Sequence, residues 1–370
     1  MKCNSSGGLE GIIPKNHFCS MSFFREAPLI NWDFTDSVLF TAYDVFRSND
    51  FWLDEVLRSG STLKEAMVGL GFPKEVQMVV DTGVFEIEAK KSGIARRLGI
   101  EPAIELTNEQ IFHAYDVSGG DYFVCPDEIV LPDDPPDVVA EKITTIKQNA
   151  RSLMERIDAS QVVGVIQGSK ESIIDDIFDF LCSQGVTNFA IGGVIPLYHY
   201  DKQLFEHVLK YVRGVTKGYS LHTFGLPRMF LVDYYLHEVG MDSVDTSILI
   251  YLTARRRYLV GSNPRPVRLV DFSACDCKGC QLLVEEEPHP RSARFFIGLY
   301  MHNLSEAAKL SAQGPGRPEG VRATDPEEVH HISQGECDSE EKQDWPPPTQ
   351  VQWRTADASL GERKGASDEG

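Results

Sequence analysis

Three cysteines and one histidine in the C-terminal part of the chain have the types and the spacing of a metal site. Cys275, Cys277 and Cys280 follow one another as Cys-x-Cys-x2-Cys, and His302 comes later in Met-His-Asn-Leu. We expect the thiols to converge in one tight loop and the histidine to arrive from a helix. Such a Cys₃His set is typical of structural zinc, which leaves no coordination position for a substrate. The alternative interpretation is three unrelated thiols in a cysteine-rich loop.

The elements that must position any further chemistry are short apolar runs alternating with amphipathic segments. Seven runs predict parallel strands, at 37–42, 76–81, 122–125, 162–167, 188–191, 220–224 and 243–245. Apolar residues recur at helical spacing between them, for example over 137–157 and 171–184. An eighth unit is not placed by the pattern. The alternation predicts an α/β fold, a (β/α)₈ barrel with insertions and with a zinc-binding subdomain near its C-terminal end.

Polar, glycine and aromatic residues stand where the predicted strands end. In a barrel of this kind the working residues lie at the carboxyl ends of the strands. Taken singly, each has a structural explanation, because an aspartate after a strand is often a helix cap, a Gly-Gly pair a turn and a phenylalanine part of the core. Taken together at successive strand ends, they predict one site at the barrel mouth. They are Asp81, Asp127, Gln167, Gly193, Phe224 and Asp245.

The order of these motifs resembles the tRNA-guanine transglycosylase family, the queuine- and archaeosine-type enzymes that exchange a guanine in nucleic acid for a 7-deazaguanine base. The similarity spans roughly residues 38–304. It rests on five segments in the family's order: Val-Asp-Thr-Gly-Val-Phe-Glu at 80–86, Pro-Asp-Glu at 126–128, Gly-Val-Ile-Gln-Gly at 164–168, Ala-Ile-Gly-Gly-Val at 190–194, and the cysteine cluster with His-Asn-Leu at 302–304.

The resemblance implies roles for two aspartates. Exchange without hydrolysis needs a group that holds the sugar at C1′ while one base leaves and another enters, and a carboxylate can do this covalently. Asp245 matches the family's nucleophile. Asp81 matches the carboxyl group that gives a proton to the leaving guanine and takes one from the incoming base. The target nucleotide must be flipped out of its stack to reach them.

The resemblance also implies a binding site for the base. Phe85 and Phe224 would sandwich the ring, while Asp127, Gln167 and the backbone of Gly193 would read its polar edge. Two departures from the family pattern leave the identity of the base open, since Val84 replaces a glycine and Glu86 a glutamine.

Three functions follow as expectations. The first is a transglycosylase acting on tRNA, which is favoured, and the second is the same chemistry on DNA. The third is a non-catalytic nucleic-acid-binding subunit of a heteromeric enzyme, against which the retention of both Asp81 and Asp245 argues. The segment after Asp245 lacks the family's Pro-Thr-Arg run, so the polymer remains open. A homodimer or a heteromer is compatible with each.

Charge and composition narrow the partners further. The net charge of −19 over 370 residues argues against a protein that coats nucleic acid nonspecifically. A local basic segment is the candidate surface for contacts with phosphates. The alternative interpretation is an ordinary solvated face. The segment contains Arg255, Arg256, Arg257, Arg265 and Arg268.

No apolar run has the length of a membrane span, and the cysteines outside the cluster form no disulfide framework. We therefore expect a cytoplasmic protein without a membrane partner. Its predicted parts are an N-terminal segment, 1–30, the barrel with its zinc site, 31–310, and a disordered acidic tail, 311–370.

Overall fold

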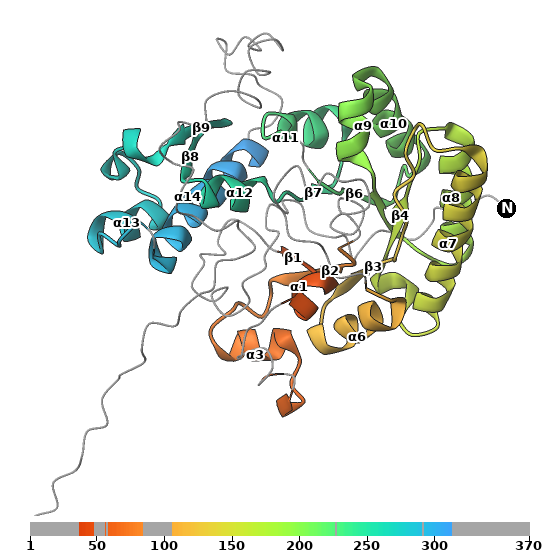
Figure 1. The fold of residues 1–370 in the computed structure, drawn as a ribbon, viewed down its shortest axis with the longest axis horizontal. Coiled ribbons are helices and arrows are strands. Elements are labelled where there is room, and N and C mark those ends of the chain that lie inside the picture. Colours follow the sequence, from red (N-terminus) through yellow and green to blue (C-terminus); the bar gives the residue numbers. More distant parts are fainter. Residues whose placement is uncertain are drawn as a thin grey trace, which may run out of the picture.

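A seven-stranded parallel sheet forms the centre of the protein (Figure 1). The computed structural model describes residues 37–47, 56, 58–83, 106–225, 228–290 and 292–312. The strands are neighbours in chain order, and the sheet curls into a half-barrel. They are β1 Ser37–Thr41, β2 Gln77–Asp81, β3 Tyr122–Val124, β4 Val162–Ile166, β5 Asn188–Ile191, β6 Ser220–Thr223 and β7 Ser243–Val244.

All seven predicted strands are confirmed, and no end differs from its prediction by more than one residue. The two predicted helices are confirmed as α7 Pro136–Met154 and α8 Glu171–Ser183. Helix α7 begins at a proline, whose fixed φ suits the first helical position and whose missing N–H would have no partner there. Just before it, the Asp134 carboxylate accepts hydrogen bonds from Leu131 N and Lys142 Nζ, each at 2.8 Å.

The eighth strand of a closed barrel is not present among the described residues. After β7 the chain forms a separate antiparallel hairpin, β8 Arg257–Val260 and β9 Asn263–Pro266, instead of adding to the parallel sheet. Pro264 and Pro266 have no N–H to donate, so β9 is suited to a two-stranded edge and not to the interior of a sheet. The prediction of a parallel α/β sheet is thus confirmed, while the structure shows a half-barrel of seven strands.

The strands present two different faces, because successive side chains alternate. One face joins the large core under the helices and includes Val38, Phe40, Met78 and Val80. The other face forms a small cluster of residues from the strands alone, with Phe224 packed against it: Leu39, Val79, Tyr122, Val124, Val163, Val165 and Ala190. This second face is the concave interior of the half-barrel.

Helices cover the outside of the curled sheet (Figure 1). Besides α7 and α8 they are α1 Ala42–Arg47, α3 Leu63–Gly69, α6 Asn108–Ser118, α9 Val194–Tyr200, α10 Lys202–Val215 and α11 Leu231–Asp233, which runs into a π-helical turn, Tyr234–Val239. Helix α6 begins with a reciprocal cap, in which Thr107 Oγ1 accepts from Gln110 N and the Gln110 side chain accepts from Thr107 N. No helix in the described part of the chain is both long and apolar enough to cross a membrane.

The C-terminal subdomain, residues 248–312 without 291, lies beside the sheet (Figure 1). It contains α12 Ile248–Ala254, the β8–β9 hairpin, two 3₁₀ turns at Val267–Leu269 and Phe272–Ala274, α13 Lys278–Glu285 and α14 Ala293–Ala312. Helices α13 and α14 approach closely at Gly279, where a Cβ would collide with the backbone of Gly298 and His302. Residues 311 and 312 belong to α14, whereas the predicted N-terminal segment and the remainder of the predicted tail lie outside the described residues.

Candidate active site and metal centre

The carboxyl ends of the strands carry the predicted site residues. Asp81 is the last residue of β2, Gln167 directly follows β4, and Asp245 directly follows β7. The strand ends are level, since the register pairs Ile166 with Ile191, Ile191 with Thr223 and Thr223 with Val244. The ladder continues one residue further, where Phe224 N donates to Ile191 O and Asp245 N to Thr223 O.

Alternation along the strands turns these side chains to one side. Asp81 comes two residues after Val79 and Gln167 two after Val165, and both valines belong to the concave cluster. Since residues two apart on a strand share a face, the carboxyl of Asp81 and the amide of Gln167 face the interior of the half-barrel. Asp245 adjoins the same interior, where it contacts an inward side chain of β6.

Asp81 and Asp245 are close enough to influence one another. Burial raises the pKa of Asp81 to about 6, and the negative charge of Asp245 adds to the rise. Hydrogen bonds from the backbone N–H groups of Gly83 and Thr82, and the neighbouring His222, oppose it. Asp81 therefore holds a proton more readily than an ordinary aspartate, as an acid catalyst near neutral pH must.

Asp127 and Gln167 form a buried pair. Gln167 Nε2 donates to Asp127 Oδ2 at 2.5 Å, and both residues are more than nine-tenths buried. Burial raises the pKa of Asp127 to about 7, while the Gln167 hydrogen bond lowers it and the charges of Asp81 and Glu128 add to the rise. Gln167 Oε1 is buried and has no hydrogen-bond partner among the described residues. An acceptor in this state is suited to a ligand N–H.

The glycine pair after β5 makes room for this amide. A Cβ at Gly192 would collide with Gln167 Nε2, and Gly193 has φ +66°, a conformation that side-chain-bearing residues rarely adopt. Gly193 directly precedes α9, and a Cβ on it would lie 3.0 Å from Gln167 Oε1, so its backbone lies beside the pair. The sequence predicted Gly193 as a site residue. In the structure it lies beside Gln167, and Gly192 permits the close approach of the amide.

Sequence reasoning missed His222. This buried side chain of β6 lies between Ser243 of β7 and Asp245, which directly follows that strand, with Nδ1 2.8 Å from Ser243 Oγ and Nε2 3.2 Å from Asp245 Oδ1. The ring of Phe224 meets it edge-on, with the centroids 4.8 Å apart. Its alternation with Phe224 along β6 was the signal in the sequence, but only the pairing of β6 with β7 shows which carboxylate it contacts.

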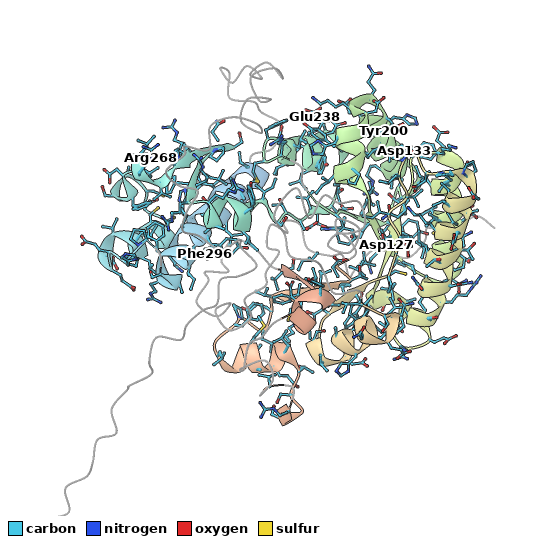
Figure 2. All side chains as sticks on the ribbon, viewed as in Figure 1. Asp127, Asp133, Tyr200, Glu238, Arg268 and Phe296 are labelled. Carbon is cyan, nitrogen blue, oxygen red and sulfur yellow. The ribbon has the colours of Figure 1, made fainter. Side chains whose placement is uncertain are left out.

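Of the two aromatic residues predicted to stack on the base, the structure describes only Phe224. Phe224 is half-buried at the mouth of the half-barrel and packs against the concave cluster. Phe85 lies outside the described residues, as do Val84 and Glu86. Asp127 lies among the strands, whereas Arg268 and Phe296 belong to the C-terminal subdomain (Figure 2).

The predicted metal ligands converge. One donor atom from each of Cys275, Cys277, Cys280 and His302 can be chosen so that all lie within 4.8 Å of one another. The three sulfurs are 3.6, 3.4 and 3.4 Å from His302 Nδ1. Tetrahedral zinc, with its usual bond lengths to sulfur and nitrogen, needs an S···N separation of about 3.6 Å. The four side chains are therefore positioned to hold a metal ion, and their chemistry and spacing fit zinc.

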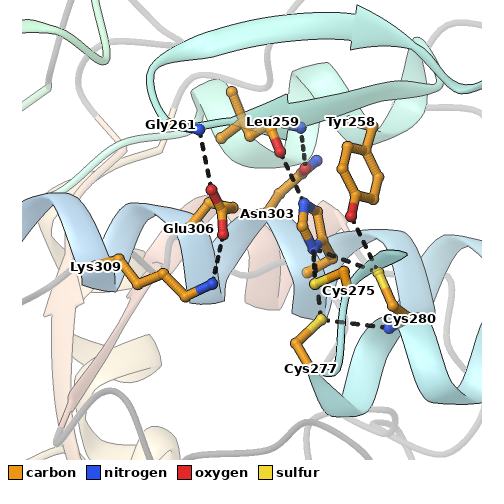
Figure 3. A network of polar contacts seen from close by, with 10 residues as sticks. Tyr258, Leu259, Gly261, Cys275, Cys277, Cys280, Asn303, Glu306 and Lys309 are labelled. Atoms are coloured by element: carbon orange, nitrogen blue, oxygen red, sulfur yellow. Dashed lines mark hydrogen bonds and ion pairs between the residues drawn. The ribbon is translucent and has the colours of Figure 1, made fainter. Parts of the chain in front are cut away.

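A second layer of contacts fixes the histidine ligand (Figure 3). His302 Nε2 is 2.8 Å from the carbonyl oxygen of Leu259, to which it donates, so that Nδ1 faces the thiols. The ring of Tyr258 stacks on the imidazole, with centroids 3.6 Å apart, and its hydroxyl lies 3.3 Å from Cys280 Sγ. The β8–β9 hairpin thus braces the candidate metal centre.

Asn303, the polar residue that follows His302, connects three elements of the subdomain (Figure 3). It is fully buried, its Oδ1 accepts from Leu259 N at 2.9 Å, and its Nδ2 donates to Thr253 Oγ1 and to the carbonyl of Arg257, each at 3.0 Å. One amide therefore ties α14 to both α12 and β8.

The arginine-rich segment belongs to the same subdomain. Arg255 follows α12 and lies over the ring of Tyr251, 4.6 Å from its centroid, and this ring is 47% exposed. The others lie on the turn after α12, on the hairpin and on the following 3₁₀ turn: Arg256, Arg257, Arg265 and Arg268. Through Tyr258 and Leu259 of the hairpin, the segment adjoins the candidate metal centre.

A comparison with protein-family models and a search of curated proteins both found no match to this chain.

Proposed function

We propose that this protein is a base-exchange transglycosylase that replaces a guanine in nucleic acid, with tRNA favoured, by a 7-deazaguanine base. The observation that carries the proposal is the pair Asp81 and Asp245 on one concave surface, with the pKa of Asp81 raised to about 6. Two carboxyl groups in different protonation states are what an exchange through a covalent intermediate requires.

In the first half of the reaction, the Asp245 carboxylate attacks C1′ of the target nucleotide. The bond from C1′ to the guanine nitrogen breaks, and its electron pair stays with the base. Protonated Asp81 gives its proton to the leaving guanine. The products are free guanine, an Asp81 carboxylate and an ester between Asp245 and the sugar.

The second half reverses these roles. The Asp81 carboxylate takes the ring N–H proton of the incoming base, whose nitrogen then attacks C1′. The ester bond breaks, and its electron pair returns to the Asp245 carboxylate. Asp81 is again protonated, so one proton serves both half-reactions and none is consumed.

Asp127 and Gln167 would select the base. An ionised Asp127 can accept hydrogen bonds from the ring N–H and the 2-amino group that guanine and the 7-deazaguanines share, and the partnerless Gln167 Oε1 is a further acceptor. A base without these donors would leave buried acceptors unpaired, which costs affinity. Phe224, and Phe85 by resemblance, would stack on the ring.

Within this proposal the metal is zinc and its role is structural. Three thiolates and one imidazole fill a tetrahedral coordination shell and leave no position for substrate. The ion would hold the loop at 275–280 to α14. These residues lie in the subdomain that carries the arginines, which we assign to contacts with backbone phosphates.

The test is incorporation of labelled guanine into unmodified tRNA and, in parallel, into duplex DNA. Asp245→Asn is the inactive variant, and Asp176→Asn, on α8 at a surface ion pair with Lys147 of α7, is the matched control. The proposal is supported if tRNA is labelled by the wild type and by Asp176→Asn but not by Asp245→Asn. Label only in DNA assigns the same chemistry to the other polymer. Label in neither overturns the catalytic proposal and leaves a non-catalytic, nucleic-acid-binding subunit.

A further inference from the structure

We propose that His222, supported by Ser243, is a positioning residue that orients the carboxylate of Asp245 for attack. This inference rests on the proposed function for its catalytic meaning, but the hydrogen-bonded array itself is a property of the fold.

The array is built by the pairing of two strands. His222 on β6 is in register with Ser243 on β7, and Asp245 follows two residues later on the same side of β7. The imidazole spans them, with Nδ1 2.8 Å from Ser243 Oγ and Nε2 3.2 Å from Asp245 Oδ1. All three residues are more than nine-tenths buried, and Asp245 is the most exposed at 9%. The array therefore runs from the closed interior towards the mouth.

The same three residue types form the catalytic triad of serine hydrolases, but here their order of burial is opposite. In the triad, serine is the nucleophile and the buried aspartate orients the histidine. In this protein Ser243 is fully buried, and Asp245 lies at the strand end. Serine is thus the group that orients the imidazole, and the carboxylate is the group that substrate can reach.

Hydrogen-bonding capacity decides where the imidazole proton lies. An ionised carboxylate can only accept, so Nε2 must carry a hydrogen to bond Asp245 Oδ1. In the neutral ring Nδ1 is then an acceptor, and the Ser243 hydroxyl donates to it. Against the ring lie Asp245, Ser243 and the edge-on ring of Phe224, and Asp81 is close enough to interact with it through its charge. None of them requires the Nδ1–H tautomer.

The consequence for Asp245 is a fixed carboxylate plane. Oδ1 accepts from His222 Nε2 and also from Gly225 N, at 2.8 Å. Two donors on one oxygen restrict rotation of the carboxylate and leave Oδ2 as the oxygen to attack C1′. When the ester later breaks, the same donors stabilise the charge that returns to the carboxylate. Both half-reactions therefore depend on His222 without contact between His222 and the substrate.

The test compares a variant that keeps a donor with one that removes it. His222→Leu should lower kcat for guanine exchange roughly tenfold to hundredfold, the scale of a misplaced catalytic group, with little change in KM for tRNA. His222→Gln retains an N–H that can reach Asp245 and should recover much of kcat. Ser243→Ala should give an intermediate loss. His207→Leu, at an exposed histidine of α10, is the matched control and should behave as wild type.

Melting temperature and metal content show whether each variant is folded. Wild-type kcat in His222→Leu would overturn the inference. So would equal losses in the Leu and Gln variants, because a purely structural effect does not distinguish a donor from an apolar side chain.

A second readout does not depend on exchange activity. Nitrogen-15 NMR of labelled histidine should show a proton on Nε2 of His222 in the wild type, with the resonance altered in Asp245→Asn and in Ser243→Ala. If the wild-type chain exchanges guanine but His222 carries its only proton on Nδ1, the inference fails and the proposed function stands. If the Nε2 proton is present but no polymer is labelled, the proposed function fails and the array remains.

Discussion

The side-chain amide of Gln167 occupies the space that a Cβ at Gly192 would fill. This contact joins the end of β4 to the end of β5 and sets the position from which Gln167 Nε2 donates to Asp127. From the sequence alone, a glycine just before a helix would be interpreted as a turn residue. Here its missing side chain is what allows the Asp127–Gln167 pair to form.

Gly192→Ala should therefore impair exchange without unfolding the protein. The added methyl group displaces the Gln167 amide, breaks its bond to Asp127 and should lower kcat/KM at least roughly tenfold, as expected when buried polar partners are separated. Gly214→Ala in α10, where a Cβ meets nothing within 4 Å, is the matched control and should leave exchange unchanged. Exchange assays and melting curves check both variants, and an active Gly192→Ala enzyme would contradict the role given to Gln167.

Asp81→Asn should stabilise the protein at neutral pH. Because burial raises the pKa of Asp81 to about 6, above its ordinary value of 3.8, the folded state binds more protons than the unfolded chain between these values. The contribution of Asp81 to stability is thus fully present below about pH 4 and is lost as pH rises through about 6. Asparagine has no charge to bury, so the free energy of unfolding of the variant should exceed that of the wild type by on the order of 1–2 kcal/mol at pH 7.5.

Urea unfolding of wild type and Asp81→Asn at pH 4.5 and pH 7.5 measures this gain. The difference in free energy of unfolding between the two proteins should be larger at pH 7.5 than at pH 4.5. Asp81→Asn should have no exchange activity at either pH. A difference that is constant with pH would show that Asp81 has no raised pKa in the folded protein.

Asp127→Asn should weaken the selection of guanine. The variant has one acceptor oxygen and an added donor where two acceptor oxygens were present, so the ring N–H and the 2-amino group can no longer both be bound. The ratio of kcat/KM for guanine over hypoxanthine, which lacks the 2-amino group, should fall roughly tenfold to hundredfold, in line with an unpaired buried polar group. Competition between the labelled bases gives this ratio directly, and an unchanged ratio would assign selection to other residues.

Cys277→Ser should lose the metal and destabilise the C-terminal subdomain. The Cys277 side chain accepts from Cys280 N at 3.4 Å and faces His302 Nδ1, so it serves both the helix start and the ligand set. Loss of structural zinc can remove on the order of 10 kcal/mol of folding free energy. Metal analysis and thermal unfolding check this, with Cys182→Ser on α8 as the control cysteine outside the cluster. A metal-free variant that melts like wild type would refute the structural role.

The local elements were predictable because their signals are short-range. The strand at 188–191 is a short apolar run, Phe-Ala-Ile, between Asn188 and a Gly-Gly pair, and its limits were confirmed to the residue. The cysteine cluster was predictable for the same reason, since three of its four ligands lie within six residues of sequence. A closed barrel was harder to predict from the sequence, because closure depends on which strands pair at the end of the chain. In the structure, β8 and β9 after β7 pair with each other as a hairpin.

The sequence by itself determined the strands, the two predicted amphipathic helices and the four residues of the candidate metal centre. Only the tertiary structure decided that His222 contacts Asp245, that Gln167 fills the space at Gly192 and that Tyr258 stacks on His302. Each of these relationships joins residues far apart in the chain. They depend on strand register and on which side of a strand or helix faces the neighbouring element, and neither is encoded in the local pattern of any one segment.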